Sequence, residues 1–200
     1  MIRAPPTHIK LNVMKSYAYF SKLKATIDRL DHEAMDVAVD MVKTTWLAGG
    51  QVITLGNGGS ALTSLHFIND WVKSISMATG KPFRGTSLAS NVGLLTAYAN
   101  DISYDEIFAS QLRSLLTPSD LVIAISGSGN SENVIRAVQF ANENGSKTIG
   151  LCGYQGGRLK LIAQHVVWVP IDDMQISEDI HFHFGHLVMQ CLVNEARGKS

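Results

Sequence analysis

Five short apolar segments, separated by stretches with helical periodicity, constrain the fold of this chain more than any other feature of its sequence. Most of them are closed by glycine, serine or asparagine. The expected strands are residues 51–55, 86–88, 121–125, 147–152 and 165–170. Strands that alternate with helices in this way are typical of a parallel sheet covered on both faces. We therefore predict a doubly wound α/β fold with a five-stranded, mainly parallel sheet.

Helical segments flank this alternation at both ends. Apolar residues recur every three or four positions over residues 9–29 and 32–48, which predicts two N-terminal helices. A closing helix is expected over residues 177–196, and Asp173 lies in the loop before it, where a helix could begin. The helical pattern therefore leaves the strands and their loops to form the middle of the chain.

Length and composition limit the domain organisation. With 200 residues, 46% of them hydrophobic and 17% charged, the chain can bury one sizeable core. We expect a single domain over residues 1–200, with residues 1–7 flexible and residues 51–197 forming the α/β core and closing helix. Cys152 and Cys191 are far apart and outside any metal-ligand spacing, so both are expected to be buried free thiols.

The charge balance limits the possible partners. The 17 basic residues cancel the 17 acidic ones, so no overall positive field attracts nucleic acid or an anionic membrane. A local basic pocket for one small anion remains compatible with this balance. Residues 1–7 lack the apolar stretch of a signal peptide, and no window approaches the roughly 20 apolar residues that cross a bilayer. We expect a soluble, cytoplasmic protein with no direct nucleic-acid or membrane binding.

Two loops at the ends of expected strands have the composition of phosphate-binding turns. Residues 56–60, with the sequence GNGGS, follow the first strand and precede a helical run. Glycines allow close approach of the backbone to a ligand, and amides at a helix N-terminus face an anion. The alternative is a tight turn with Ser60 as the helix N-cap. This loop alone does not decide between the two interpretations.

Residues 126–131, with the sequence SGSGNS, form the second loop and again join an apolar strand to a helix. Hydroxyls and amides without a nearby lysine suit a phosphate monoester held by neutral donors and a helix dipole. Ordinary capping and serine turns are the alternative. Because ligands of this fold class bind at the carboxyl ends of strands, two such loops at one sheet edge favour a binding site.

These loops form part of a recognisable pattern. Together with Asn100 and Asp101, followed by Tyr104 and Phe108, the two loops resemble the sugar isomerase (SIS) domains, and most of all the phosphoheptose isomerases. The resemblance covers about residues 15–197. It implies a flavodoxin-like SIS fold whose members are homotetramers, with the helices of residues 9–48 used in oligomerisation.

Acid–base chemistry has two candidate locations in the sequence. His66 and Asp70 are four residues apart on the helix after the first loop, so they share a face. Glu178, His181, His183 and His186 cluster on the last helix, with His183 pointing further round. For any one of these histidines, a structural role is the alternative. Aldose–ketose isomerisation requires a base, an acid and a group that stabilises the developing oxyanion.

The resemblance assigns roles to these residues. It makes Asp70 the general base and His186 its acid partner, and it implies a site for zinc, or another divalent metal, at His66, Asp70, Glu178 and His186. Asp70 stands where the family usually has glutamate, and Glu178 where it has glutamine. The shorter Asp70 reaches less far, and the added carboxylate makes the ligand set more anionic.

The resemblance also implies a set of substrate-binding residues. Serine hydroxyls would hold the phosphate, with the remaining groups near the sugar. The positions are Asn57, Gly58, Ser60, Asn100, Asp101, Ser126, Ser128, Ser131 and Glu178.

Two functions follow from the resemblance. The first is a ketose–aldose isomerase that converts sedoheptulose 7-phosphate to D-glycero-D-manno-heptose 7-phosphate through an enediol. The second is a non-catalytic SIS protein that binds phosphosugars or associates with the bacterial replication initiator. The histidine at position 186 favours the enzyme, and the aspartate at position 70 keeps the alternative open.

Overall fold

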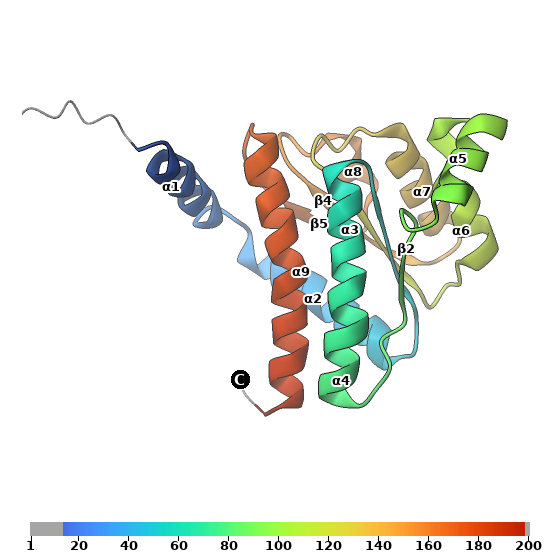
Figure 1. Ribbon diagram of the computed structural model, residues 1–200, viewed down its shortest axis with the longest axis horizontal. Helices are drawn as coiled ribbons and strands as arrows, with labels where there is room; N and C mark the ends of the chain where they lie inside the picture. The colour runs from blue at the N-terminus through green and yellow to red at the C-terminus, as the bar shows by residue number, and fades with distance from the viewer. Residues whose placement is uncertain (1–13, 199–200) are drawn as a thin grey trace, which may run out of the picture.

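The central sheet has five parallel strands in the order β2-β1-β3-β4-β5 in a computed structural model that describes residues 14–198 (Figure 1). The strands are β1 Val52–Gly56, β2 Gly85–Ser87, β3 Leu121–Ser126, β4 Lys147–Cys152 and β5 His165–Trp168. All residues of β1 and β3 are buried, as expected for strands covered on both faces. The predicted five-stranded α/β fold is confirmed.

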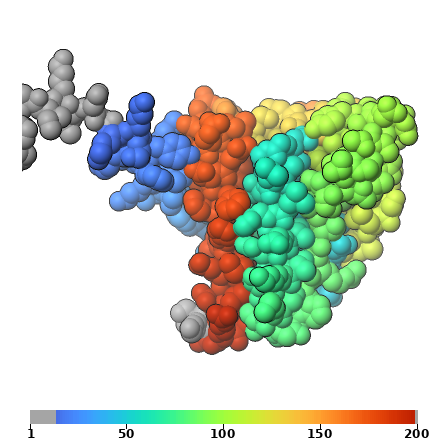
Figure 2. Space-filling view, viewed as in Figure 1, coloured from blue at the N-terminus to red at the C-terminus, as the bar shows by residue number. Residues whose placement is uncertain are grey.

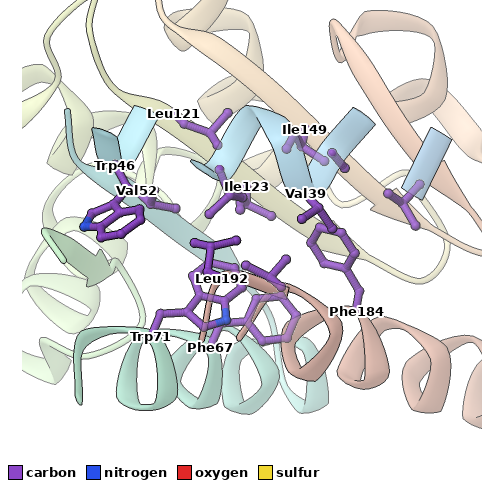
Figure 3. Close-up of a cluster of buried hydrophobic side chains, with 14 of the residues drawn as sticks. Val39, Trp46, Val52, Phe67, Trp71, Leu121, Ile123, Ile149, Phe184 and Leu192 are labelled. Carbon is purple, nitrogen blue, oxygen red and sulfur yellow. The ribbon is translucent and has the colours of Figure 1, made fainter. Parts of the chain in front are cut away.

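Helices cover both faces of the sheet. The helical elements are α1 Lys15–Ile27, α2 His32–Leu47, α3 Gly59–Asp70, a π-helix Trp71–Ile75, α4 Ser76–Thr79, α5 Val92–Asp101, a 3-10 turn Tyr104–Glu106, α6 Ala109–Leu115, α7 Glu132–Glu143, α8 Gly157–Ile162 and α9 Met174–Ala196. Side chains of α2, α3 and α9 form the core on one face, which Figure 3 shows in part. Side chains of α6, α7 and α8 fill the other face.

Local capping explains where the long helices start. Asp31 accepts a hydrogen bond from the Ala34 amide at the start of α2, and Asp173 accepts one from the Ile176 amide at the start of α9. The last helix therefore begins at Met174, one turn earlier than the predicted residue 177. The part of the first predicted helix before residue 14, and the flexibility expected for residues 1–7, lie outside the described residues.

Helix α1 lies at one side of the molecule, beyond α9 (Figures 1 and 2). Its Leu23 packs with Ile176 and Ile180 of α9. Tyr17 and Phe20, by contrast, are more than 60% exposed. Helix α1 thus carries an apolar surface that one chain leaves uncovered.

The two cysteines occupy different environments. Cys152 is buried at the end of β4, and desolvation raises the pKa of its thiol to about 12. Cys191 is free but exposed on α9, so the prediction that it is buried is wrong. Near the end of α9, Val188 and Leu192 are buried against the core, whereas position 191 lies on the exposed side of the helix.

Strand order determines where a ligand can enter. Strands β1 and β3 are neighbours, but the helices that follow them, α3 and α7, contribute to the cores on opposite faces. Their connecting loops therefore diverge, and the crevice between them is the usual ligand site of this strand order. Among residues 14–198, no helix combines the length and hydrophobicity needed to cross a membrane.

Candidate active site

A small cavity of about 120 Å³ lies between the loops that follow β1 and β3. We call it the serine pocket. Its lining consists of Asn57, Ser60, Ile125, Ser126, Gly127, Ser128, Ser131, Met174 and Glu178. The structure thus brings together the four predicted phosphate-binding serines. No lysine or arginine belongs to this lining within residues 14–198, and Glu178 is its ionisable member.

Two helix N-termini open toward the serine pocket. Helix α3 starts behind Gly58 and α7 behind Ser131, and neither N-cap residue makes a side-chain capping bond. The first amides of both helices are therefore available to an anion, which the positive ends of the helix dipoles also favour. The alternative interpretation of Ser60 as N-cap is wrong, because Gly58 occupies that position.

Asn57 is held rigidly at the rim of this pocket. Its Oδ1 accepts hydrogen bonds from Tyr104 Oη at 2.9 Å and from Asn133 Nδ2 at 3.0 Å. Its Nδ2 donates to Asn133 Oδ1 at 2.9 Å. One N–H of Asn57 is left for a ligand, so this side chain can act as a donor to a sugar hydroxyl. Sequence reasoning missed the buried Asn133, because one asparagine near a helix start gives no local signal.

Further along α3 and α9, three ionisable side chains converge. The Nε2 atoms of His66 and His186 are 3.0 Å apart. Asp70 Oδ2 lies 3.1 Å from the first and 3.7 Å from the second. The other carboxylate oxygen, Oδ1, accepts a bond from Asn69. The predicted base, its acid partner and one predicted metal ligand therefore form one partly buried cluster, here called the His–Asp cluster.

Aromatic packing keeps the two imidazoles in place. The ring of Phe182 lies 4.4 Å from that of His66 and 4.9 Å from that of His186, measured between centroids. Candidate ligand atoms of the three ionisable residues all lie within 4.8 Å of one another. Two imidazoles and one carboxylate are a donor set suited to zinc, so these residues fit a divalent metal.

Known proteins share both the sequence and this arrangement of elements. Residues 18–153 match the family model described as the SIS domain. The chain is 36% identical to the phosphoheptose isomerase of Syntrophotalea carbinolica over 180 residues, or 88% of this chain and 91% of that protein. The chain belongs to the phosphoheptose isomerase family. It is an isomerase, as the resemblance of its motifs predicted.

Solved structures of the phosphoheptose isomerase family have the same fold. The enzyme from Neisseria gonorrhoeae matches with a TM-score of 0.80 and 27% identity, over 89% of this chain and 96% of that one. The enzyme from Francisella tularensis matches with a TM-score of 0.81 and 27% identity, over 94% and 100%. The flavodoxin-like SIS fold expected from the resemblance is thereby confirmed.

The two family positions that this chain changes lie in different parts of the site. Asp70 belongs to the His–Asp cluster. Glu178 lines the serine pocket instead, and its Oε1 lies 2.8 Å from where a Cβ on Gly59 would stand. The described chain thus brings three of the four predicted metal ligands together, and the part of Glu178 in that set stays a prediction.

Asn100 and Asp101 lie away from the serine pocket. Both are exposed at the end of α5, where Asn100 Nδ2 donates to Asp101 Oδ1 at 2.8 Å. The cavity nearest to α5, of about 250 Å³, is lined by other residues of that helix together with Asn57 and Gly58. Substrate binding by these two residues therefore stays a prediction, and one chain alone does not bring them to the pocket.

Three further residues of α9 lie outside the serine pocket and the His–Asp cluster. Asp179 accepts a 2.6 Å hydrogen bond from Tyr19 of α1, and this bond raises the pKa of Tyr19 to about 12. His183 is exposed. His181 is fully buried, and neither ring nitrogen has a hydrogen-bond partner among the described residues. Burial lowers the pKa of His181 to about 4.

The buried His181 predicts acid sensitivity. Between pH 6.5 and about 4 the unfolded chain binds a proton at this position that the folded chain excludes. Stability is therefore lost as the pH falls through this window, by about 3 kcal/mol from this one group. We expect His181→Leu to flatten the pH dependence of the free energy of unfolding, measured by urea denaturation. His183→Leu is the control, and equal pH slopes in the two variants would contradict the prediction.

Proposed function

We propose that the chain interconverts sedoheptulose 7-phosphate and D-glycero-D-manno-heptose 7-phosphate by proton transfer through an enediol. One observation carries this proposal: a pocket lined by serine hydroxyls and a carboxylate–imidazole cluster lie along the same pair of helices. Ser60 and His66 belong to α3, and Glu178 and His186 belong to α9. The names of the relatives support a heptose phosphate as the substrate.

Helix geometry supports the length of the substrate. Ser60 and His66 are six positions apart, and Glu178 and His186 are eight positions apart. At about 1.5 Å per residue, the serine pocket and the His–Asp cluster lie ~9–12 Å apart along the helices. An extended seven-carbon sugar with a terminal phosphate covers a similar distance between its phosphate and its C1 and C2 atoms.

In this arrangement the proposed reaction has a simple sequence of proton transfers. The phosphate occupies the serine pocket, and Asn57 donates a hydrogen bond to a hydroxyl group of the sugar. Asp70 removes the proton from the carbon next to the carbonyl group while His186 donates a proton to the carbonyl oxygen, which gives the enediol. Return of a proton from Asp70 to the other carbon, with loss of a hydroxyl proton to His186, completes the isomerisation. No net oxidant or reductant is required.

We further propose that His66, Asp70 and His186 hold a zinc ion or another divalent metal, with Glu178 as the fourth candidate ligand. When bound, such an ion supplies Lewis-acid polarisation of the substrate oxygen. The convergence of two imidazole nitrogens and a carboxylate oxygen supports this assignment.

Metal binding has a direct thermodynamic test. A ligand that binds only the folded state at a hundred times its Kd stabilises that state by about 2.7 kcal/mol. We expect added Zn²⁺ to raise the melting temperature of the native chain and to have much less effect on His66→Ala. His183→Ala, which removes an exposed histidine of α9, is the matched control. Equal shifts in the two variants would argue against this metal site.

We infer that the protein is a cytoplasmic homotetramer. The exposed apolar side chains of α1 suit burial by other copies of the chain, and the exposed free Cys191 suits a reducing compartment. Light scattering of the purified protein measures the assembly, and a monomer at micromolar concentration would overturn the tetramer.

The experiment that tests the function combines turnover with isotope exchange. The purified protein is incubated with sedoheptulose 7-phosphate in D₂O, and the aldose product is followed by NMR spectroscopy. We expect heptose 7-phosphate to form with deuterium at the carbon that receives the proton. Absence of product would overturn the proposal, and product without deuterium would overturn the step in which a solvent-exchanging Asp70 carries the proton.

A further inference from the structure

A buried hydrogen bond joins the two helices that carry the His–Asp cluster. Trp71 Nε1 donates to the carbonyl oxygen of Gly185 at 2.9 Å, and the Trp71 side chain is fully buried. Each partner is the direct sequence neighbour of a cluster residue, since Asp70 precedes Trp71 and His186 follows Gly185. The bond therefore fixes the separation of the two backbones at the level of the proposed base and acid.

The helices approach closely at this point because position 185 is glycine. A Cβ on Gly185 would stand 2.2 Å from ring atoms of Phe67. This distance is too short for any side chain at position 185. The Phe67 ring stacks on Trp71 with centroids 5.0 Å apart and meets Phe184 edge-on at 6.2 Å. Figure 3 shows these three aromatic side chains grouped under the sheet, where α3 meets α9.

The helix changes its geometry immediately after the proposed base. Residues up to Asp70 are α-helical, so His66 and Asp70 keep the spacing that places them on one face. From Trp71 to Ile75 the helix is a π-helix, which inserts one residue relative to the α-helical pattern. Trp71 thus stands where the helix changes register, and its indole anchors this point to α9.

We propose that Trp71 is a positioning residue, whose indole N–H holds Asp70 and His186 at their working separation. This inference rests on the proposed function, in which these two side chains exchange protons with the substrate. A large apolar side chain alone would fill the core. The directional bond to Gly185 adds a fixed distance between α3 and α9, and proton transfer depends steeply on such distances.

The chain provides a matched control in the same core. Trp46 is also buried, and its Nε1 donates to a backbone carbonyl, that of Pro82, at 3.1 Å. This bond joins α2 to the loop before β2, and neither partner adjoins the His–Asp cluster in sequence. Trp46→Phe and Trp71→Phe therefore make the same chemical change in one hydrophobic cluster. They differ in which two segments lose a connecting hydrogen bond.

The test compares kcat, KM and crystal structures of these two variants. We expect both to lower the melting temperature by a few degrees. Only Trp71→Phe is expected to lower kcat, by about tenfold or more, with KM within about twofold of the native value. Its crystal structure should show Asp70 and His186 further apart than in the native protein, and that of Trp46→Phe should not. Equal kcat losses, or an unchanged Asp70–His186 separation, would overturn the proposal.

Two further arms keep the test decisive. If the native chain fails to isomerise any heptose phosphate, the proposed function fails, while the Asp70–His186 separation in the variant structures still decides the positioning role. If Trp71→Phe does not fold, 3-benzothienylalanine introduced at position 71 keeps the shape of the indole and removes only its N–H donor. Native kcat and native separation in that variant would likewise overturn the inference.

Discussion

Asp70→Asn is expected to lower kcat for the ketose phosphate by about 10³-fold, because the amide cannot accept the proton from carbon. Asparagine has nearly the same shape as aspartate, and Asp70 is only partly buried. The free energy of unfolding should therefore change little. Steady-state isomerisation and thermal unfolding of the same preparation measure the two effects separately.

Two control variants make this result specific. Asp36→Asn removes an exposed carboxylate of α2 and should leave kcat unchanged. Asp70→Glu restores the residue usual in the resembled family and should retain far more activity than Asp70→Asn, because it keeps a carboxylate base at this position. An Asp70→Asn variant with more than a tenth of the native kcat would remove Asp70 from the mechanism.

The partner of Asp70 allows a test of their joint action. His186 Nε2 lies 3.7 Å from Asp70 Oδ2, so the two groups are close enough to work on one substrate. Residues that act as one catalytic unit have strongly non-additive effects. The double variant Asp70→Asn and His186→Asn should therefore be little slower than Asp70→Asn alone. If the fold-loss in kcat of the double variant equals the two single fold-losses multiplied together, the two residues have independent roles.

The strands could be predicted from the sequence because buried parallel strands are continuous apolar segments. The predicted residues 147–152 coincide with β4, and the other strands agree within a few residues. The boundary of α9 was less accurate. Its start depends on the capping bond that Asp173 accepts from the Ile176 amide.

The site was only partly predictable, because it combines local spacing with distant contacts. The four-residue spacing of His66 and Asp70 places them on one face of a helix, which the sequence itself shows. Their contact with His186, 120 residues later, depends on how α3 and α9 pack. Only the family resemblance pointed to it.

Distant partners explain what the sequence did not reveal. Asn133 orients Asn57 across 76 positions, and Trp71 reaches Gly185 across 114. Glu178 stands eight residues before His186, which places it ~12 Å away along α9. In the structure Glu178 lines the serine pocket, while His186 lies beside Asp70.

Gly129→Ala is expected to disrupt the serine pocket through the second loop. Gly129 has a φ of +67°, and a Cβ there would stand 2.0 Å from the backbone oxygen of Gly156. Its carbonyl also accepts the Leu159 amide at 2.9 Å, so the second loop is braced against the start of α8. The added methyl group must push the loop away from α8 and displace the hydroxyls of Ser128 and Ser131.

Gly145→Ala is the control for Gly129→Ala, because it has the same backbone strain without the clash. Gly145 has a φ of +77°, but the nearest atom to a Cβ there is 3.8 Å away. Both variants carry the left-handed penalty of about 1–2 kcal/mol, whereas the clash should bring the total for Gly129→Ala to about 2–5 kcal/mol. A 1 Å displacement of positioning groups lowers rates by about 10²-fold, so kcat/KM for the sugar phosphate should fall that far in Gly129→Ala alone. If both variants retain native kcat/KM, the second loop does not hold the phosphate, and the anion must bind to the loop after β1.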